Sequence, residues 1–277
     1  GQGMTSDAPA HGEAAATPAP LSGLQSGRAR RSGPERSRGA RAGVSEPARP
    51  DSVRRHNLSL ALDTILEAGR PLSRAEIAAS TGLTRGAVSA LVYRLMEAGL
   101  LVELEPVAAQ RAGRPAVPLA PARGTIAAIG MEVNVDYLGV RALDLAGHSL
   151  IERVELGDFR GSEPARVLDR LGDLAERVMA TLAREDVRVV GTALALPGLV
   201  DRVTGPLRVA PNLGWRDVDV VGLLAARPAL AEFPPRLANE ANLGARAELV
   251  ARRGSDLRSF VYVSGEVGIG GAIVLDG

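Results

Sequence analysis

The chain has 277 residues, which fits two modest domains better than one compact unit. Its 45% hydrophobic and 23% charged content lies near the globular average and excludes both wholesale disorder and a coiled coil. All 33 basic residues are arginine, but the formal net charge is only +1, so a nucleic-acid partner must be argued from local placement.

No cysteine is present, which excludes disulfides, thiolate zinc sites and cysteine nucleophiles within this sequence. The histidines His11, His56 and His148 are too scattered to indicate a metal cluster. No apolar run reaches the roughly 18 residues of a membrane span, and the N-terminus lacks a basic stretch followed by an apolar block. We therefore expect a soluble, cytoplasmic protein with no metal site and no membrane partner.

Residues 1–50 are rich in small residues and proline, and six arginines stand against one glutamate between Arg28 and Arg41. Such a segment cannot bury enough apolar surface to offset its ordering entropy, which predicts a disordered tail. A basic arm that adds phosphate contacts to a neighbouring DNA-binding module is the alternative.

Three short amphipathic helices are expected from residue 51 onward. The first ends at Gly69 and presents one apolar face, which comprises Leu58, Ala61, Leu62, Ile65 and Leu66. Ser73 and Glu76 form a capping box at the start of the second helix, which a turn at residues 80–82 ends.

The third helix follows a capping Thr84 and closes at Gly99, and its inward side chains are Val88, Leu91, Val92 and Leu95. Two strands are expected at residues 100–104 and 116–119, joined by a turn of glycine, arginine and proline. Two helices, a turn, a third helix and a hairpin are the order of a winged helix-turn-helix, which we assign to residues 51–119.

In a helix-turn-helix the third helix enters the major groove, so its outward residues near the N-terminal end are expected to read DNA. Arg85 can contact guanine as a bidentate pair, and arginines of the wing can enter a narrow minor groove. The predicted DNA contacts are Arg54 and Arg55 before the first helix, Thr84, Arg85, Gly86, Ser89, Tyr93 and Arg94 at the third helix, and Arg111, Gly113 and Arg114 in the wing. A winged helix that binds protein is the alternative.

A linker at residues 120–124 leads into a second domain at residues 125–277. Its long helix, capped by Ser162, has an apolar face of Val167, Leu168, Leu171, Leu174, Val178 and Leu182. An apolar run at residues 187–196 predicts a strand buried on both faces. The other expected elements are strands at 125–133, 137–145, 149–156, 260–264 and 270–275, a turn at Pro197-Gly198, a short helix at 218–226 and a strand-to-helix join at Asn239. This order predicts an α/β domain.

Ordered motifs run from Arg54 to the end of the chain: Arg54-Arg55-His56-Asn57, Pro71-Leu72-Ser73-Arg74-Ala75-Glu76-Ile77-Ala78, Gly113-Arg114-Pro115-Ala116, Asp144-Leu145-Ala146-Gly147, Pro197-Gly198, Asn212-Leu213-Gly214-Trp215, Asn239-Glu240-Ala241-Asn242 with Glu248, and Gly265-Glu266-Val267-Gly268-Ile269-Gly270-Gly271. With these motifs the chain resembles the ROK family of repressors and sugar kinases, specifically its xylose-type and N-acetylglucosamine-type repressors. The resemblance implies an actin-like, ribonuclease-H-like effector domain that closes around a sugar and, through dimer geometry, changes operator affinity.

Kinase members of this family carry a D-x-G-x-T phosphate loop between the first two strands, where this chain has Glu132-Val133-Asn134-Val135-Asp136. Their second phosphate loop, G-T-G-I-G, begins here with Glu266 and Val267. Carboxylates at these places repel phosphates by on the order of several kcal/mol each in a partly dry site. We therefore expect no catalytic residue and no kinase activity.

The resemblance assigns Asn239 and Glu240 to sugar hydroxyls, because kinase relatives use an Asn-Asp pair at this position, and it offers Gly198 and Asn212 as further lining residues. Alternatively, Asn239 is a helix N-cap. The alternative for Glu240 is a negative charge that stabilises the first turn of the helix. Both readings can hold at once.

Further along, the family carries an E-x-G-H sugar-contacting motif and a cysteine-rich zinc loop. Both would lie beyond Gly277, so the effector domain is expected to be incomplete at its C-terminus and to hold no cofactor in this chain.

These features together predict a sugar-responsive transcriptional regulator, a repressor of carbohydrate-metabolism genes. Its expected partners are double-stranded operator DNA and a small sugar or sugar-phosphate effector, and the full-length protein is expected to form a homodimer or higher homo-oligomer. A sugar kinase with a DNA-binding extension and a protein-interaction adaptor are the alternatives.

Overall fold

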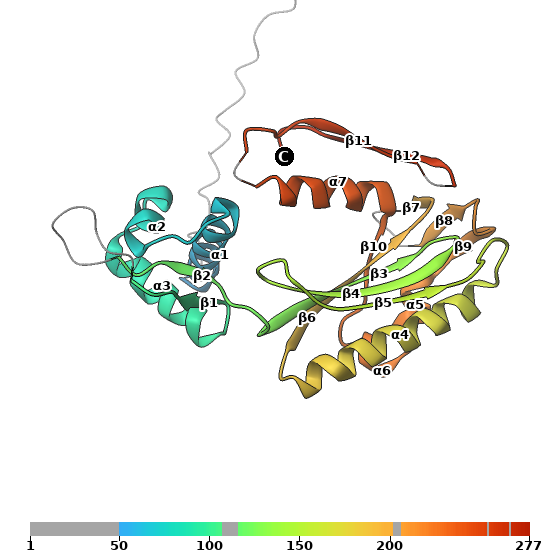
Figure 1. The fold of residues 1–277 in the computed structure, drawn as a ribbon, viewed down its shortest axis with the longest axis horizontal. Helices are drawn as coiled ribbons and strands as arrows, with labels where there is room; N and C mark the ends of the chain where they lie inside the picture. Colours follow the sequence, from blue (N-terminus) through green and yellow to red (C-terminus); the bar gives the residue numbers. More distant parts are fainter. Residues whose placement is uncertain (1–49, 107–115, 202–205, 254, 266) are drawn as a thin grey trace, which may run out of the picture. The chain divides into compact units, whose positions relative to one another are not determined.

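The computed structural model describes residues 50–106, 116–201, 206–253, 255–265 and 267–277 (Figure 1). The helices are α1 (Pro50–Ala68), α2 (Arg74–Thr81), α3 (Arg85–Glu97), α4 (Pro164–Arg184), α5 (Val220–Ala225), α6 (Pro228–Ala231) and α7 (Glu240–Ala251). The strands are β1 (Leu101–Glu103), β2 (Leu119–Pro121), β3 (Ile126–Val133), β4 (Tyr137–Asp144), β5 (Ser149–Leu156), β6 (Arg188–Leu196), β7 (Leu199–Val200), β8 (Leu207–Ala210), β9 (Trp215–Val218), β10 (Arg236–Asn239), β11 (Phe260–Gly265) and β12 (Ile269–Val274). Except for Pro50, where α1 begins, the tail expected at residues 1–50 lies outside the described residues.

The second and third helices begin where their caps predict. The Ser73 hydroxyl accepts the Glu76 N–H at 3.2 Å, and the Glu76 carboxylate accepts the Ser73 N–H at 2.8 Å, which confirms the capping box. Thr84 likewise accepts the Ala87 N–H at 3.2 Å and caps α3. The three helices bury a cluster of their own, which comprises Ala61, Ile65, Leu72, Ile77, Ala78, Val88, Leu91, Val92, Leu95, Leu101 and Leu119.

The turn between these two helices is shorter than predicted. Ser80 and Thr81 belong to α2, where the Thr81 hydroxyl donates to the Ile77 carbonyl at 2.7 Å. The chain leaves the helix only at Gly82, whose φ of 72° is in the left-handed region that glycine adopts without a steric cost.

The hairpin is present, but its second strand is displaced from the predicted residues 116–119. Strand β2 pairs antiparallel with β1 in the register Leu101 to Pro121 and Glu103 to Leu119. The fully buried Leu119 also exchanges two backbone hydrogen bonds with Leu72, at 2.8 and 3.1 Å. Because burial and pairing fix the strand at Leu119, it runs into Ala120 and Pro121, which the sequence had placed in a linker.

A five-stranded mixed sheet in the order β10-β6-β3-β4-β5 organises the second domain. The three successive strands predicted at the start of this domain are present as β3, β4 and β5 and form an antiparallel meander, and β6 and β10 join parallel to β3 on its other side. The α/β prediction is therefore confirmed. The carboxyl ends of the parallel strands β3, β6 and β10 point to the same edge of the sheet, which is where α/β proteins generally bind ligands.

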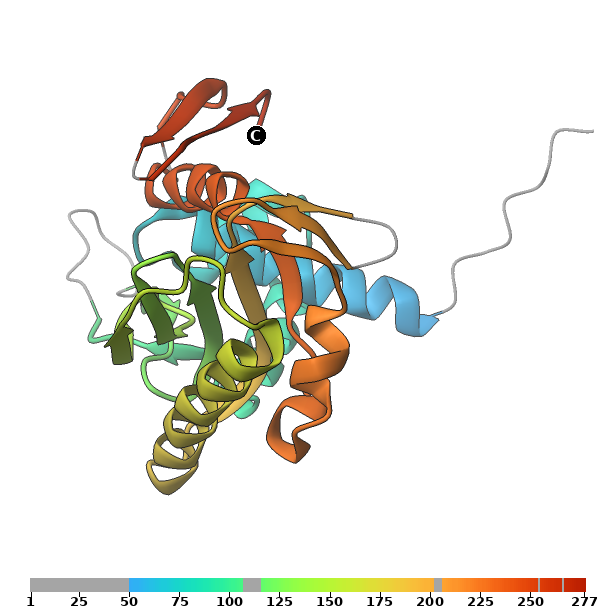
Figure 2. The ribbon, with the colours of Figure 1, turned by 90° about the vertical axis from the view of Figure 1, so that its right-hand side faces the viewer.

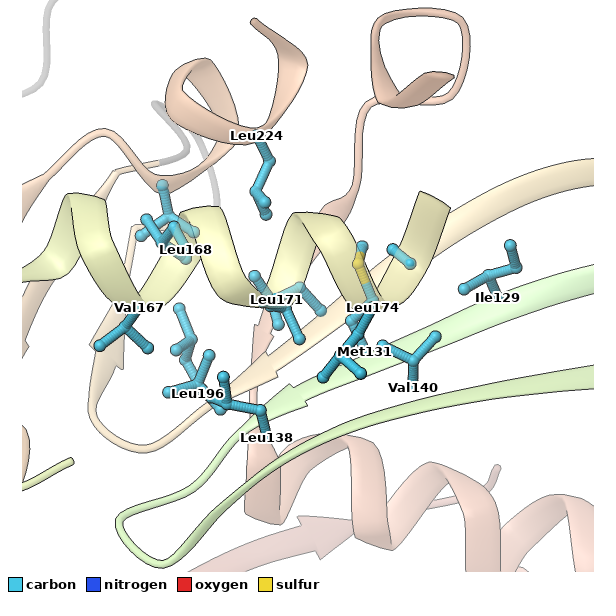
Figure 3. Close-up of a cluster of buried hydrophobic side chains, with 14 of the residues drawn as sticks. Ile129, Met131, Leu138, Val140, Val167, Leu168, Leu171, Leu174, Leu196 and Leu224 are labelled. Atoms are coloured by element: carbon cyan, nitrogen blue, oxygen red, sulfur yellow. The ribbon is translucent and has the colours of Figure 1, made fainter. Parts of the chain in front are cut away.

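Helix α4 covers one face of this sheet and buries the predicted apolar stripe, as the side chains in Figure 3 show. Its cap is Glu163, not the predicted Ser162: the Glu163 carboxylate accepts the N–H groups of Ala165 and Arg166 at 3.0 and 2.9 Å. Ser162 has another role, because its carbonyl and hydroxyl accept the indole N–H of the buried Trp215 at 2.9 and 3.2 Å.

Strand β6 is not buried on both faces. Thr192, Leu194 and Leu196 are buried, whereas Val190 is 50% exposed and the residues between the buried ones are half-buried. An apolar run alone does not separate a strand covered on one face from a strand covered on both.

The remaining predicted elements are present, with a small addition. The expected short helix is α5, capped by Asp219, and the two final strands pair antiparallel as β11 and β12 beside α7. Figure 2 shows this hairpin along α7, and α4 beside α5 and α6. Helix α6 and the three-stranded sheet of β7, β8 and β9, whose strands have two to four residues each, were not predicted.

One arginine ties the segment of α5 and α6 to α4. The Arg227 guanidinium, only 19% exposed, contacts the carboxylates of Asp169 at 2.5 Å, of Glu176 at 2.7 Å and of Asp173. The hydrogen bond to Glu176 is the main cause that raises the pKa of Arg227 above its ordinary value. Gly172 leaves room for this group, since a Cβ there would lie 2.6 Å from the Arg227 Nε atom.

We expect Gly172→Ala to lower the free energy of unfolding by about 1 to 2 kcal/mol, because overpacking costs more than the helix propensity of alanine returns. Urea denaturation of the purified variant measures this. Gly86→Ala is the matched control, because Gly86 is helical with open space around its Cα atom. That control should equal or exceed the wild-type stability, and a stabilised Gly172→Ala would contradict the prediction.

Candidate DNA-reading face and effector cavity

The outward face of α3 carries the side chains that the sequence predicts for DNA reading. Arg85, Gly86, Ser89, Tyr93 and Arg94 are all exposed, and Tyr93 is 63% exposed. The buried residues of the same helix are Val88, Leu91, Val92 and Leu95. Capping and burial therefore fix which side of α3 is open to a partner.

Two side chains of this face have hydrogen-bond partners within α3. The Ser89 hydroxyl donates to the Arg85 carbonyl at 2.9 Å. The phenol of Tyr93 donates to Glu97, and this hydrogen bond, with the negative charge of Glu97, raises the pKa of Tyr93. Among the described residues, the Arg85 guanidinium forms no ion pair or side-chain hydrogen bond, which leaves its donors available.

Arg54 and Arg55 do not precede the first helix but lie within α1, on its exposed first turns. Proline at the first position and an acidic Asp51 favour a helix start this early. The predicted wing contacts Arg111, Gly113 and Arg114 lie outside the described residues, and the capping Thr84 is exposed at the N-terminal end of α3.

A cavity of about 810 Å³ lies at the carboxyl ends of the parallel strands. It brings together all four ligand candidates, Gly198, Asn212, Asn239 and Glu240. Other polar lining residues are Glu132, Asn134, Asn242, Arg246 and Ser264. No ligand role was predicted for Arg246 or for Asn242, which was noted only as a member of the motif that begins at Asn239. Their spacing of three and seven residues from Asn239 on a helix is a signal that could have found them.

Asn239 caps α7 at the wall of the cavity. Its Oδ1 atom accepts the N–H groups of Ala241 and Asn242 at 3.0 and 3.3 Å, which confirms the N-cap reading. Its Nδ2 atom donates to the Gly198 carbonyl at 3.0 Å and to the Glu240 carboxylate at 2.6 Å. These bonds hold both side chains at the wall of the cavity.

The backbone at Gly198 approaches strand β8 more closely than a side chain permits. Gly198 has a φ of 118°, and a Cβ there would lie 2.8 Å from the Ala210 Cα atom and closer still to the Val209 carbonyl oxygen. Only glycine fits this conformation and this approach. The turn therefore positions the carbonyl that binds Asn239.

The turn between β3 and β4 forms another part of the cavity wall. The Asn134 N–H donates to the Tyr137 carbonyl at 2.9 Å, and the Val135 N–H donates to the Asn134 Oδ1 atom at 2.6 Å. Glu132 accepts the Tyr137 hydroxyl at 2.7 Å, and Asp136 pairs with Arg160 at 2.9 Å. Glu266, predicted at the start of the segment that matches the second phosphate loop of kinases, lies outside the described part of the chain.

Within the described ranges, no helix is both long and apolar enough to cross a membrane. The same ranges contain no group of three or more His, Asp or Glu side chains placed to hold a metal ion.

A comparison with protein families matches residues 151–277 to the ROK family and residues 60–105 to the IclR helix-turn-helix domain. Residues 151–277 therefore form a ROK-family domain. The α/β effector domain and N-terminal helix-turn-helix of the chain agree with the architecture that the sequence resemblance implied.

The relatives that match this chain include proteins named as repressors and one named as a kinase. The xylose repressor of Bacillus subtilis (strain 168) is 27% identical over 81% of this chain and 56% of the repressor. A glucokinase of Halalkalibacterium halodurans is 24% identical over 54% of this chain and 44% of the kinase. This chain spans about half the length of the curated relatives it matches.

A solved structure agrees with this assignment. The crystal structure of a ROK family transcriptional regulator, a homolog of the E. coli MLC protein, is 25% identical and superposes with a TM-score of 0.62. The match covers 81% of this chain and 55% of that chain, and so extends well beyond the share of this chain that the glucokinase matches.

Proposed function

We propose that this chain carries the DNA-binding and effector-binding parts of a sugar-responsive transcriptional repressor. The observation that supports it most is the presence, in one chain, of a helix-turn-helix with an open reading face and a ROK domain with a polar cavity. Repressors named for xylose match about four fifths of the chain. The proposal needs no cofactor in the described residues.

The proposed mechanism is linkage between two binding equilibria. A sugar that binds one conformation of the effector domain better than another shifts the population by the ratio of its two affinities. In a dimer, the two helix-turn-helix domains bind two half-sites of the operator. If the favoured conformation holds these domains at the wrong spacing for the half-sites, operator affinity falls. No bond of the sugar is broken in this scheme.

The geometry of the β3–β4 turn supports the repressor over a kinase. The amides of Asn134 and Val135, which would have to receive phosphate oxygens, already donate to protein oxygens within the turn. The cavity-lining Glu132 adds negative charge, and like charges repel a phosphate group. Measurable sugar phosphate formed from ATP and a panel of hexoses and pentoses would favour the kinase instead.

The function is tested by a gel-shift titration of the protein against its own upstream DNA, with and without candidate sugars. The expected result is a retarded band whose intensity falls as the salt concentration rises, because arginine contacts to phosphates release counterions. At least one sugar should also change the intensity of this band. Absence of any salt-dependent DNA binding would overturn the proposal in favour of a protein-interaction adaptor.

We expect Arg85→Ala to weaken operator binding about ten- to a hundredfold, because a bidentate arginine contact contributes about 1 to 3 kcal/mol. Fluorescence anisotropy with the operator and with a scrambled duplex measures the loss, which should be larger on the operator. Arg70→Ala is the matched control, since Arg70 is exposed but pairs with Glu76 outside α3. An unchanged affinity in the Arg85 variant would remove Arg85 from the reading face.

A further inference from the structure

Among the described residues that line the cavity, Arg246 is the one basic side chain, and the repressor mechanism above does not use it. Arg246 stands on α7 one turn after Asn242, and both residues line the cavity. Residues four apart on a helix are neighbours on one face, about 5 to 6 Å apart at their Cβ atoms. Long helical side chains also lean toward the N-terminus of their helix, here toward Asn239 and Glu240.

The charged groups of this wall differ in how they are paired. Glu132 accepts the Tyr137 hydroxyl at 2.7 Å, and Glu240 accepts the Asn239 amide at 2.6 Å. Arg246 is exposed and, among the residues that the structure describes, forms no ion pair and no side-chain hydrogen bond. By contrast Arg252, at the end of the same helix, pairs with Glu248 at 3.2 Å.

The donor and acceptor pattern of the wall selects a class of ligand. The carboxylate of Glu240 and the side-chain amide of the exposed Asn242, which both line the cavity beside Asn239, can accept from and donate to hydroxyl groups, as a sugar ring requires. A guanidinium without a protein partner offers paired N–H donors in the planar geometry that phosphate and carboxylate groups match. A neutral sugar would satisfy the first set of groups and leave Arg246 unused.

We propose that the effector is a sugar that carries an anionic group, a phosphate or a carboxylate, and that Arg246 binds this group. The proposal rests on the effector-binding function above and deepens it. The hydroxyl groups of the ligand lie toward Asn239 and Glu240, and its anionic group lies toward the C-terminal part of α7.

The test compares matched ligands by isothermal titration calorimetry: glucose, glucose 6-phosphate and glucuronate, and then xylose and xylonate. We expect at least one anionic sugar to bind about tenfold or more tightly than its neutral counterpart, with a preference that shrinks as salt rises. Arg246→Leu should abolish the preference, and Arg246→Lys should retain part of it. The phosphate and the carboxylate members of the set distinguish the two kinds of anion.

Arg253→Ala is the control for a general effect of positive charge, because Arg253 is exposed just after α7 and is not a lining residue of the cavity. This variant should keep the full preference for the anionic ligand. A neutral sugar that binds the wild type as tightly as its anionic counterpart would overturn the Arg246 proposal and leave the repressor function standing. A preference that survives Arg246→Leu would overturn it as well, and binding of none of these sugars would count against both proposals.

Discussion

Gly198→Ala is expected to lower the free energy of unfolding by about 3 kcal/mol or more, and to abolish effector binding. The added Cβ meets the backbone of Val209 and Ala210 and not a movable side chain, and the φ of 118° is strained for any other residue. Strain of this kind costs about 1 to 3 kcal/mol, and overpacking adds a similar amount. Movement of the turn would also take the Gly198 carbonyl away from Asn239.

Urea denaturation and ligand titration measure the two effects separately. Gly191→Ala is the matched control, because Gly191 lies in the neighbouring strand β6 with open space where a Cβ would stand. The control should differ from the wild type by no more than about 0.5 kcal/mol. If Gly198→Ala were equally mild, the close approach of the turn to β8 would not determine the cavity wall.

Local signals in the sequence predicted the elements that local physics determines. Caps at Ser73, Thr84 and Asn239 mark helix starts because the side chain and the backbone N–H that it accepts are two or three residues apart. The alternation of buried residues predicts strand β3, and the spacing of the apolar stripe predicts helix α4, because both patterns also lie within a short stretch of sequence. The resemblance of motifs then assembled these elements into the right architecture.

The errors arise where distant contacts decide. Ser162 has the chemistry of a cap but is held by Trp215, and Glu163 takes the cap instead. The second hairpin strand is fixed by the pairing of Leu119 with Leu72, which no local window of sequence contains. The same holds for Arg227, whose carboxylate partners are more than 50 residues away along the chain.

The candidate site contains residues that the sequence predicted and others that it did not predict. The four residues that the family motifs singled out all reach the cavity, although they come from different parts of the chain. Arg246 was missed because the motifs describe what relatives share, and an exposed arginine on a helix reads as an ordinary solvated residue. Among the arginines that the structure describes, Arg246 is distinguished by its position on α7 at the wall of the cavity.

Leu171→Ala is expected to lower the free energy of unfolding of the effector domain by about 3 to 5 kcal/mol. Leu171 is fully buried on α4 and faces the sheet, in a cluster with Met131, Leu138 and Leu196 (Figure 3). Removal of a buried leucine loses the transfer free energy and leaves a cavity, which together cost about 2.7 to 5 kcal/mol. Thermal unfolding followed by circular dichroism measures the loss.

The separation of the two hydrophobic clusters makes this prediction selective. Leu171 belongs to the cluster of the sheet and α4, whereas the helix-turn-helix buries a different set of residues. Leu171→Ala should therefore weaken the sugar response before it weakens contact with a single half-site, since the reading helix keeps its own core. Leu156→Ala is the matched control, because Leu156 is 80% exposed and its loss should change stability by less than about 0.5 kcal/mol. Parallel loss of half-site binding and sugar response at the same temperature would show that the two clusters unfold as one unit.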